Sequence, residues 1–319
     1  MENKKIVINS SQIENTNLQE NKIALELKNF SVYFENEPFL ENLNYKFEKG
    51  KIHYIVGPSG CGKTVLITHF NGLMTSKHGL IEVFNVPLIL KKNKIKNVKY
   101  IRSKIGMVFQ FAEYQLFKKT ILKDIIFGPM NFGVKKEDAI ERAKKYIKLV
   151  GLDESFLSRD PFGLSGGQKR RVAVAGILAI EPDILIFDEP TAGLDPNGEK
   201  DFLEIFKILK KMGKTIIVVT HSMNLAIEVA DNLVVINEGK IVKDGDIYDI
   251  FSDEELIVKT NLSIPLIYKT IKLLSEKNDD FKKLFELRPR TISELAKNIS
   301  EIIKQQNTKP QKRTYEKRK

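Results

Sequence analysis

The chain has 319 residues, of which 42% are hydrophobic and 29% are charged, which is the composition of a globular protein with a sizeable core. No apolar run approaches the roughly 18 residues that a membrane-spanning helix needs, so we expect a chain that does not cross a bilayer unaided. The formal net charge of +11 favours anionic partners such as nucleotides, lipid headgroups or nucleic acid, but it does not choose among them.

Both ends of the chain are polar. Residues 1–22 are rich in Asn, Gln and Glu and lack the apolar centre of a secretory signal, which predicts a flexible cytoplasmic leader. Residues 306–319 are basic with few apolar side chains, which predicts a disordered tail, with contact to an anionic membrane face as the alternative. The single cysteine, Cys61, cannot form an intramolecular disulfide, which fits a reducing compartment.

The region before residue 57 is predicted to be rich in strands, beginning with residues 23–34. Residues 43–47 and 52–56 are two further apolar segments, and residues 48–51 between them form a turn typical of a hairpin. We therefore expect the strands on either side of this turn to pair. The second of them leads directly into a glycine-rich segment.

This segment opens a helix predicted at residues 65–73. Its residues are Gly57, Pro58, Ser59, Gly60, Cys61, Gly62, Lys63 and Thr64. Backbone N–H groups of such a loop can surround phosphates, because glycine has no Cβ to hold the main chain away from an anion and the helix N-terminus adds positive potential. The pattern predicts a nucleoside triphosphate site, with Lys63 on the β- and γ-phosphates and the Thr64 hydroxyl on Mg²⁺. Cys61 occupies a variable position of this loop, and a redox role for it is the less favoured interpretation.

Helices and short apolar strands then alternate. We expect further helices at 136–150, 167–180, 198–212 and 223–230, and strands at 105–109, 184–187, 215–219 and 233–237. Such alternation is typical of an α/β fold with a largely parallel sheet covered by helices on both faces.

Two adjacent carboxylates, Asp188 and Glu189, end the predicted strand at 184–187. Because successive strand residues point to opposite sides, we expect Asp188 to face the metal and Glu189 to face the γ-phosphate and polarise the attacking water. A solvated turn is the alternative, and the four apolar residues before the pair argue against it.

Together with Leu164-Ser165-Gly166-Gly167-Gln168, these motifs resemble the nucleotide-binding subunit of an ABC transporter over about residues 22–245. The resemblance implies a P-loop NTPase with a RecA-like core, an antiparallel β-subdomain and a helical signature subdomain at about 111–180. It also implies a dimer, because the family signature lies at a helix N-terminus and presents Ser165 and the amides of Gly166 and Gly167 to the opposite subunit's γ-phosphate. The implied cofactors are ATP and Mg²⁺.

Other positions match the family one by one. Phe34 resembles the aromatic residue that stacks on adenine, with neighbouring Tyr33 as the rival. Gln110 resembles the residue that ligates Mg²⁺ and senses the membrane partner. Asp195 resembles the residue of the loop that bridges the two nucleotide sites, and His221 resembles the switch histidine that contacts the γ-phosphate. We expect the remaining histidines to be structural or surface groups; these are His53, His69 and His78.

Finer details are similar to the ATPases of energy-coupling factor (ECF) transporters, the cobalt and vitamin importers. These details lie in residues 108–117, 127–133, 168–176 and 190–196, although Ala112 replaces the proline that is usual there. In that family two paralogous ATPases usually pair, and this chain looks more like the second paralogue. The implied partners are a second ABC ATPase subunit, a transmembrane coupling subunit and a substrate-binding membrane subunit, with no nucleic acid. The implied location is peripheral, at the cytoplasmic face of the membrane.

An apolar and aromatic cluster follows Gln110 and consists of Phe111, Tyr114, Leu116 and Phe117. It suits the gripping of short coupling helices of a membrane protein, and burial within the helical subdomain is the alternative. Residues 91–104, just upstream, are more basic than this connection requires, and we assign them no function.

Beyond about residue 245 the pattern becomes helical and rich in Lys and Glu, as in 265–277 and 292–305. The expected layout is a leader at 1–22, an ABC ATPase domain at 23–245, a helical extension at 246–305 and a tail at 306–319. The extension carries no catalytic spacing and is interpreted as an element of packing or dimer stabilisation.

The expected activity is ATP hydrolysis coupled to transport of a vitamin or metal ion. Another ABC importer, for amino acids or metal chelates, is the first alternative. A soluble ABC ATPase of DNA repair or translation is less favoured, because neither a coiled-coil insertion nor a second cassette is visible. A P-loop kinase or GTPase would not carry the segment 164–168 beside His221. The transported substrate is chosen by another subunit.

Overall fold

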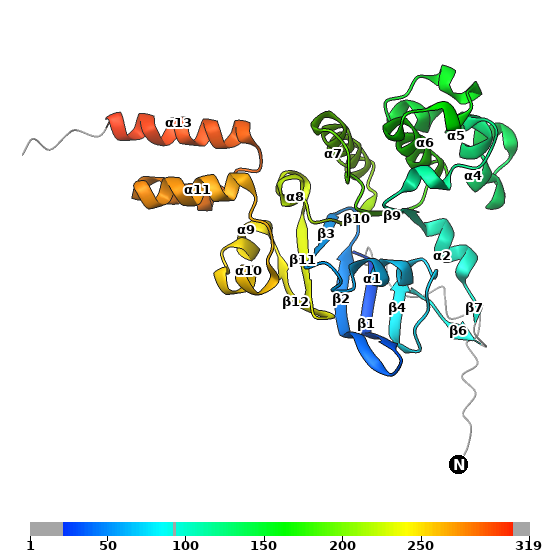
Figure 1. Ribbon diagram of the computed structural model, residues 1–319, viewed down its shortest axis with the longest axis horizontal. Coiled ribbons are helices and arrows are strands. Elements are labelled where there is room, and N and C mark those ends of the chain that lie inside the picture. The colour runs from blue at the N-terminus through cyan, green and yellow to red at the C-terminus, as the bar shows by residue number, and fades with distance from the viewer. Residues whose placement is uncertain (1–21, 92–93, 309–319) are drawn as a thin grey trace, which may run out of the picture.

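The computed structural model describes residues 22–91 and 94–308 (Figure 1). Almost all of the predicted leader and residues 309–319 of the predicted tail lie outside the described residues, as do Lys92 and Asn93 of the basic segment. No helix within the described part of the chain is long and apolar enough to span a bilayer.

A six-stranded sheet forms the centre of the molecule, in the order β12-β11-β3-β10-β9-β8. All neighbouring strands are parallel except β12, which pairs antiparallel with β11. The strands are β3 (Ile52–Val56), β8 (Ile105–Val108), β9 (Ile184–Asp188), β10 (Thr215–Val219), β11 (Asn232–Asn237) and β12 (Lys240–Gly245). The predicted α/β fold is therefore confirmed.

The central sheet separates two hydrophobic clusters. Along β9, Ile184 and Ile186 pack into one cluster, whereas Leu185 and Phe187 pack into the other, as the two-residue period of a strand requires. The first cluster includes α1 (Lys63–Phe70) and the antiparallel sheet, and the second includes α7 (Pro196–Lys211), α8 (Met223–Val229) and the helical subdomain. Because both faces are covered, β3, β9 and β10 are buried along their whole length.

A second sheet, of four antiparallel strands, has the order β2-β1-β4-β5. Its strands are β1 (Ile23–Phe34), β2 (Glu37–Glu48), β4 (His78–Val83) and β5 (Val86–Pro87). The hairpin predicted around residues 48–51 is wrong, because β2 pairs with β1 while β3 lies between β10 and β11 in the other sheet. The physical reason is burial: β2 has many exposed positions and suits a sheet with one wet face, whereas β3 is fully buried and suits the centre of a parallel sheet.

The helical subdomain lies beside the β8 edge of the central sheet (Figure 1). It contains α3 (Ile121–Ile125), α4 (Phe127–Asn131), α5 (Lys136–Leu149) and α6 (Gly166–Leu178), and two short 3₁₀ turns lie between α5 and α6. A 3₁₀ turn at Ala112–Gln115 packs against α6. The signature residues thus stand at the start of the helix that joins this subdomain to the core.

The C-terminal extension packs on the same core. Its helices are α9 (Ile247–Phe251), α10 (Glu254–Thr260), α11 (Leu266–Lys277), α12 (Lys283–Leu287) and α13 (Ile292–Thr308). Ile250 and Ile271 are fully buried in the cluster that also contains α7 and α8. Arg288 and Arg290 both pair with Asp246, which ties the segment before α13 to the start of α9.

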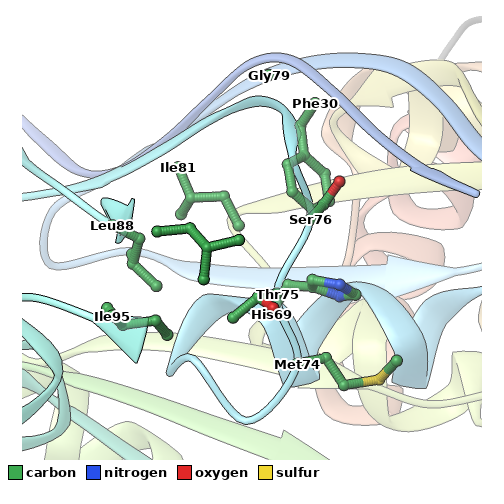
Figure 2. A pocket seen from close by; sticks show the side chains of 10 residues that line it. Phe30, His69, Met74, Thr75, Ser76, Gly79, Ile81, Leu88 and Ile95 are labelled. Atoms are coloured by element: carbon green, nitrogen blue, oxygen red, sulfur yellow. The ribbon is translucent and has the colours of Figure 1, made fainter. Parts of the chain in front are cut away.

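Within the described part of the basic segment at 91–104, Arg102 links the segment to the end of α1. The hairpin of β6 (Leu90–Lys91) and β7 (Lys94–Ile95) precedes α2 (Val98–Lys104), and Arg102 donates hydrogen bonds to the carbonyls of Asn71 and Gly72 at the end of α1. Ile95 also lines a small cavity of about 30 Å³ between α1 and the antiparallel sheet (Figure 2). In this cavity the ring of His69 lies against Phe30, with its Nδ1 donating to the Val65 carbonyl at 2.7 Å.

The histidines outside the site are structural or surface groups, as expected. His53 and His69 are buried, and His78 is exposed. Burial lowers the pKa of both His53 and His69 below the ordinary value of 6.5. The unfolded chain therefore binds protons that the folded chain does not, and stability falls as the pH drops below about 6.5.

We accordingly expect a lower melting temperature at pH 5.5 than at pH 7.5, and a shallower dependence in His69→Gln, measured by thermal unfolding in buffers of equal ionic strength. The matched control is His78→Gln, which removes a surface histidine. If the pH dependence of the melting temperature in His69→Gln equals that of the unmodified chain, buried His69 does not contribute to it, whatever the absolute stability of that variant.

Candidate active site

The glycine-rich loop joins β3 to α1 in the central sheet. At Gly57, with φ of 150°, an added Cβ would lie 2.0 Å from the carbonyl oxygen of Ile236, and at Gly62, with φ of 103°, it would lie 2.5 Å from Leu40. Both glycines are therefore required by the fold itself. No side chain caps the N-terminus of α1 and no acidic residue lies in its first turn, so its N–H groups and positive dipole end are directed at the loop. This arrangement suits a polyphosphate.

The ammonium group of Lys63 is held inside this loop. Its Nζ donates hydrogen bonds to the carbonyls of Gly57 at 2.9 Å and Pro58 at 2.8 Å. Burial raises the pKa of the neighbouring Cys61 thiol, so little thiolate forms at neutral pH and the residue is a poor nucleophile. Lys63 is thus the charged side chain of the loop that can bind phosphate.

Thr64, at the end of the loop, contacts Asp188 at the end of β9. The Thr64 hydroxyl donates to the Asp188 carboxylate, with Oγ1 to Oδ2 at 3.1 Å, and Asp188 is only 5% exposed. Burial raises the pKa of this carboxyl group above its usual range. A hydroxyl and a carboxylate are hard oxygen ligands, and Mg²⁺ is usually bound by one or two such groups together with substrate phosphates. The predicted metal residues Thr64 and Asp188 therefore fit Mg²⁺.

Glu189 lies at the carboxyl edge of the sheet, between β9 and β10. Its Oε1 is 3.0 Å from Nδ1 of His221, and its Oε2 accepts a hydrogen bond from the Thr220 hydroxyl at 3.1 Å. Its backbone has φ of 45°, an uncommon conformation for a residue with a side chain, and its N–H donates to the Val219 carbonyl at 2.8 Å. The structure thus brings the predicted residues Glu189 and His221 together.

Gln110 lies two residues beyond β8, which ends at Val108 rather than at the predicted residue 109. Since β8 pairs in parallel with β9, Gln110 lies at the same edge of the sheet as Asp188. Gln110 is exposed to solvent, which leaves its side chain free to approach a ligand of the phosphate loop.

Phe34 and Tyr33 end β1 and are similarly exposed, at 44% and 42%. The ring of Phe34 contacts Phe39 edge-on at 5.1 Å between centroids, and Phe39 lies next to Gly62 of the phosphate loop. Tyr33 instead contacts His78, at 4.7 Å between centroids. Phe34 is thus linked to the phosphate loop through Phe39, whereas Tyr33 contacts a histidine outside the site.

The signature residues form the N-terminus of α6. Gln168 N–H donates to Ser165 Oγ at 3.3 Å, and Ser165 N–H donates to Gln168 Oε1 at 3.1 Å, which is a capping box. A Cβ added at Gly166 or Gly167 would meet nothing within 4 Å. The fold of this chain therefore does not require glycine at either position, in contrast to Gly57 and Gly62. Glycines without an internal reason are expected where the backbone closely approaches another molecule.

Asp195 caps α7, accepting a hydrogen bond from Gly198 N–H at 2.7 Å. Asp195 and Ser165 line the same surface cleft, between α6 and α7. Figure 1 shows α6 in the helical subdomain, away from α1. The structure therefore contains two separate groups of site residues: the phosphate loop with Glu189, and the signature with Asp195.

Sequence reasoning missed several side chains around these groups. Thr220 binds the Glu189 carboxylate, and no pattern distinguished it from other strand-end threonines. The extension contacts the segment that carries His221: Ser263 Oγ donates to the His221 carbonyl at 3.3 Å, and the Asn224 side chain accepts from Leu266 N–H at 2.7 Å. Arg290 donates to the Ala230 carbonyl at the end of α8. The extension therefore holds both ends of the helix that follows His221.

A phosphate loop on a parallel sheet, an acidic strand end and a glycine-rich signature on a separate helical subdomain define an ABC-type ATPase. Comparison with known sequences agrees, since residues 40–192 match a family described as ABC transporter. The chain is 51% identical over 271 residues to the energy-coupling factor transporter ATP-binding protein EcfA2 of Mycoplasmoides gallisepticum, covering 83% of this chain and 85% of that protein. The chain therefore belongs to the family of energy-coupling factor transporter ATP-binding proteins.

Solved structures agree with this assignment. CbiO1 from Clostridium perfringens, described as part of the ABC transporter complex CbiONQ, has a TM-score of 0.67 and 32% identity, over 79% of this chain and 99% of that one. The ATP-binding cassette MJ0796, solved as a dimer bound to ADP and phosphate, has a TM-score of 0.61 and 29% identity, over 70% of this chain and 98% of that one. The ABC ATPase fold and the ECF family predicted from the sequence are confirmed.

Proposed function

We propose that this chain is the ATP-binding and hydrolysing subunit of an ECF-type ABC importer. The observation that carries the proposal is the placement of Lys63, Thr64, Asp188, Glu189 and His221 around one edge of a parallel sheet. These residues can bind a triphosphate and activate water, while the signature faces solvent elsewhere. The family relatives support the ECF assignment.

Each residue of the edge has a role in hydrolysis. Lys63 and the loop amides bind the β- and γ-phosphates, and Gln110, Thr64 and Asp188 would hold Mg²⁺, which neutralises charge that develops on the phosphates. Glu189 accepts a proton from the attacking water, as a general base. Thr220 and His221 hold the Glu189 carboxylate in place, and the exposed His221 ring can reach the γ-phosphate.

The proposed working unit is a dimer of this chain with a second ABC ATPase subunit. Ser165, Gly166 and Gly167 of one subunit would bind the γ-phosphate held by the phosphate loop of the other, and Asp195 would lie between the two sites. ATP then contacts both subunits and stabilises only the closed dimer, so hydrolysis allows reopening. The openness around Gly166 and Gly167 supports this arrangement.

The substitution Ser165→Arg tests the dimer. We expect it to abolish ATP occlusion at the partner's nucleotide site while this chain's own phosphate loop still binds ATP, because the large side chain blocks the anion-binding helix end. Mixed dimers with one labelled subunit, photocrosslinked to nucleotide, report occupancy at each site. The control is Ser158→Arg, an exposed serine of the same subdomain. Loss confined to the mutated chain's own site is incompatible with the proposal.

The proposed membrane-facing surface lies beside Gln110. Phe111, Tyr114 and Phe117 are exposed by 54%, 84% and 55%, while Leu116 is buried. The alternative that the cluster is buried is therefore wrong for three of its four residues. Exposed Phe127 of α4 packs edge-on against Phe117, which extends the aromatic surface. Such a surface suits apolar coupling helices of a transmembrane subunit.

The proposed location is peripheral, at the cytoplasmic face of the membrane, with the coupling subunit and a substrate-binding membrane subunit that selects a vitamin or metal ion. Purification of the tagged chain in mild detergent tests this assembly. We expect a second ABC ATPase and integral membrane subunits to copurify. Recovery of the chain without any membrane subunit argues against an importer, and recovery with periplasmic-type importer subunits favours an amino-acid or metal-chelate system.

A further inference from the structure

Arg170 is a buried arginine of the signature helix α6, five residues after Ser165, and is 6% exposed. Its Nη1 donates to the carbonyls of Ala192 at 2.8 Å and Pro190 at 3.2 Å. Its Nε and Nη2 face the two carboxylate oxygens of Glu113 at 3.4 Å and 3.5 Å. One guanidinium group therefore connects three segments that are distant in the sequence.

Because Arg170 is buried, it needs all of these contacts, and they require the shape of an arginine side chain. A buried guanidinium is costly unless its charge and its N–H groups are all compensated, and removing one partner leaves an uncompensated charge. Only the planar fork of arginine can bind two carbonyls on one side and a carboxylate on the other, so lysine cannot replace it. Glu113 is the sole carboxylate in salt-bridge distance of Arg170 within the described chain.

The carbonyls that Arg170 binds belong to the turn after Glu189. Pro190 follows Glu189 directly, and Ala192 N–H donates back to the Glu189 carbonyl at 3.2 Å. Glu189 itself has a positive φ, so its side chain points correctly only if this turn keeps its shape. Arg170 thus holds the backbone of the turn, whereas Thr220 and His221 contact the Glu189 carboxylate.

The carboxylate that Arg170 binds belongs to the proposed membrane-facing surface. Glu113 is in the 3₁₀ turn at Ala112–Gln115, between the exposed rings of Phe111 and Tyr114 and three residues after Gln110. Displacement of this turn by a docked partner would act directly on the guanidinium group. A membrane subunit that moves Phe111 and Tyr114 would therefore displace Glu113, and through Arg170 this displacement would reach the turn that carries Glu189.

We propose that Arg170 is a positioning residue that holds the Glu189 turn in its hydrolytic geometry and, through Glu113, links that geometry to the docked membrane subunit. The second half of the proposal rests on the proposed function. Neither Arg170 nor Glu113 is among the residues proposed to bind the nucleotide. Their effect is exerted on the orientation of Glu189, where a displacement of about 1 Å can lower a rate on the order of 10²-fold.

The test uses Arg170→Lys, Glu113→Gln and the double variant in the detergent-purified complex, with kcat and KM for ATP measured separately. We expect Arg170→Lys to lower kcat by about 10- to 100-fold with KM for ATP changed by less than about twofold. We expect Glu113→Gln to lower kcat by about 3- to 10-fold, because the carbonyl contacts remain, and the double variant to be no slower than Arg170→Lys alone. The variants should also lose most of the stimulation of ATP hydrolysis by the membrane subunits.

The matched control is Arg142→Lys with Glu181→Gln. Arg142 is also an arginine of the helical subdomain that pairs with a glutamate, at 3.0 Å, and donates to two backbone carbonyls. These contacts lie away from Glu189, so parental kcat is expected. Parental kcat in Arg170→Lys overturns the positioning role, as does a rise of KM in place of a fall of kcat.

Additive effects of Arg170→Lys and Glu113→Gln overturn the link between the two residues. If Arg170→Lys does not fold, as judged by its thermal unfolding, Glu113→Gln alone decides, and an unchanged kcat and stimulation overturn the proposal. Failure of the proposed function looks different, because the unmodified complex then lacks membrane subunits or shows no stimulation by them.

Discussion

Glu189→Gln is expected to slow ATP hydrolysis by on the order of 10²- to 10⁴-fold while ATP binding stays intact, which is the usual loss when a general base is removed. Glutamine has the same shape and can still accept the hydrogen bond from Thr220, so the turn and its positive φ are retained. An amide cannot take a proton from water at neutral pH. The slow step is therefore expected to be the chemical step, after the proposed dimer has closed on ATP.

The measurement is single-turnover hydrolysis of bound ATP, with nucleotide affinity from an equilibrium titration. Glu238→Gln is the matched control, because Glu238 also has a positive φ, of 47°, but is exposed in the turn between β11 and β12. Wild-type turnover in Glu189→Gln removes this residue from its assigned role. Loss of binding in the variant instead means that Glu189 serves the fold or the nucleotide pocket.

Lys63→Ala is expected to abolish ATP binding, and with it hydrolysis. The Lys63 ammonium is the one positive side chain within the glycine-rich loop, and the carbonyls of Gly57 and Pro58 hold it beside the loop amides that would surround the phosphates. Without it, the negative charge of the triphosphate lacks its nearest compensating group. The backbone amides and the helix dipole carry only partial charges, so they do not replace the full positive charge of the ammonium group.

Titration of the full chain with a fluorescent ATP analogue measures this effect. The matched control is Lys99→Ala, which removes an exposed lysine from the first turn of α2 and changes the net charge equally. An affinity of Lys63→Ala equal to that of Lys99→Ala contradicts the assignment of the phosphate loop. A general electrostatic effect of the basic chain would weaken both variants alike.

Five of the six strands of the central sheet were predicted within one or two residues, whereas β12 was not predicted. Residues 184–187 and 215–219 are continuous apolar runs bounded by polar residues, and such runs indicate strands buried on both faces. The partner of each strand was not predictable. The turn at residues 48–51 has hairpin chemistry, yet the strands on its two sides enter different sheets. Strand pairing depends on burial against distant segments, which turn residues do not encode.

Arg170 illustrates the same limit for the site. Its spacing of four from buried Val174 places both on one face of α6, but Lys169 and Arg171 have the same spacing from buried Ala173 and Ala175 and are less buried, so this spacing did not single out Arg170. Nothing in the sequence identified its partners, because Glu113 and Pro190 lie 57 and 20 residues away. Contacts at such separations exist only after the helical subdomain and the sheet have packed together.

The sequence alone determined which chemistry the protein carries, because the phosphate loop, the Asp188-Glu189 pair and the signature are contiguous motifs whose residue types already specify ligand and reaction. Only the tertiary structure decided which groups meet: Thr64 with Asp188, Glu189 with Thr220 and His221, and Arg170 with Glu113. The physical reason is that parallel strands bring their carboxyl ends to one edge in an order set by long-range packing. That order, β3-β10-β9-β8, creates the site.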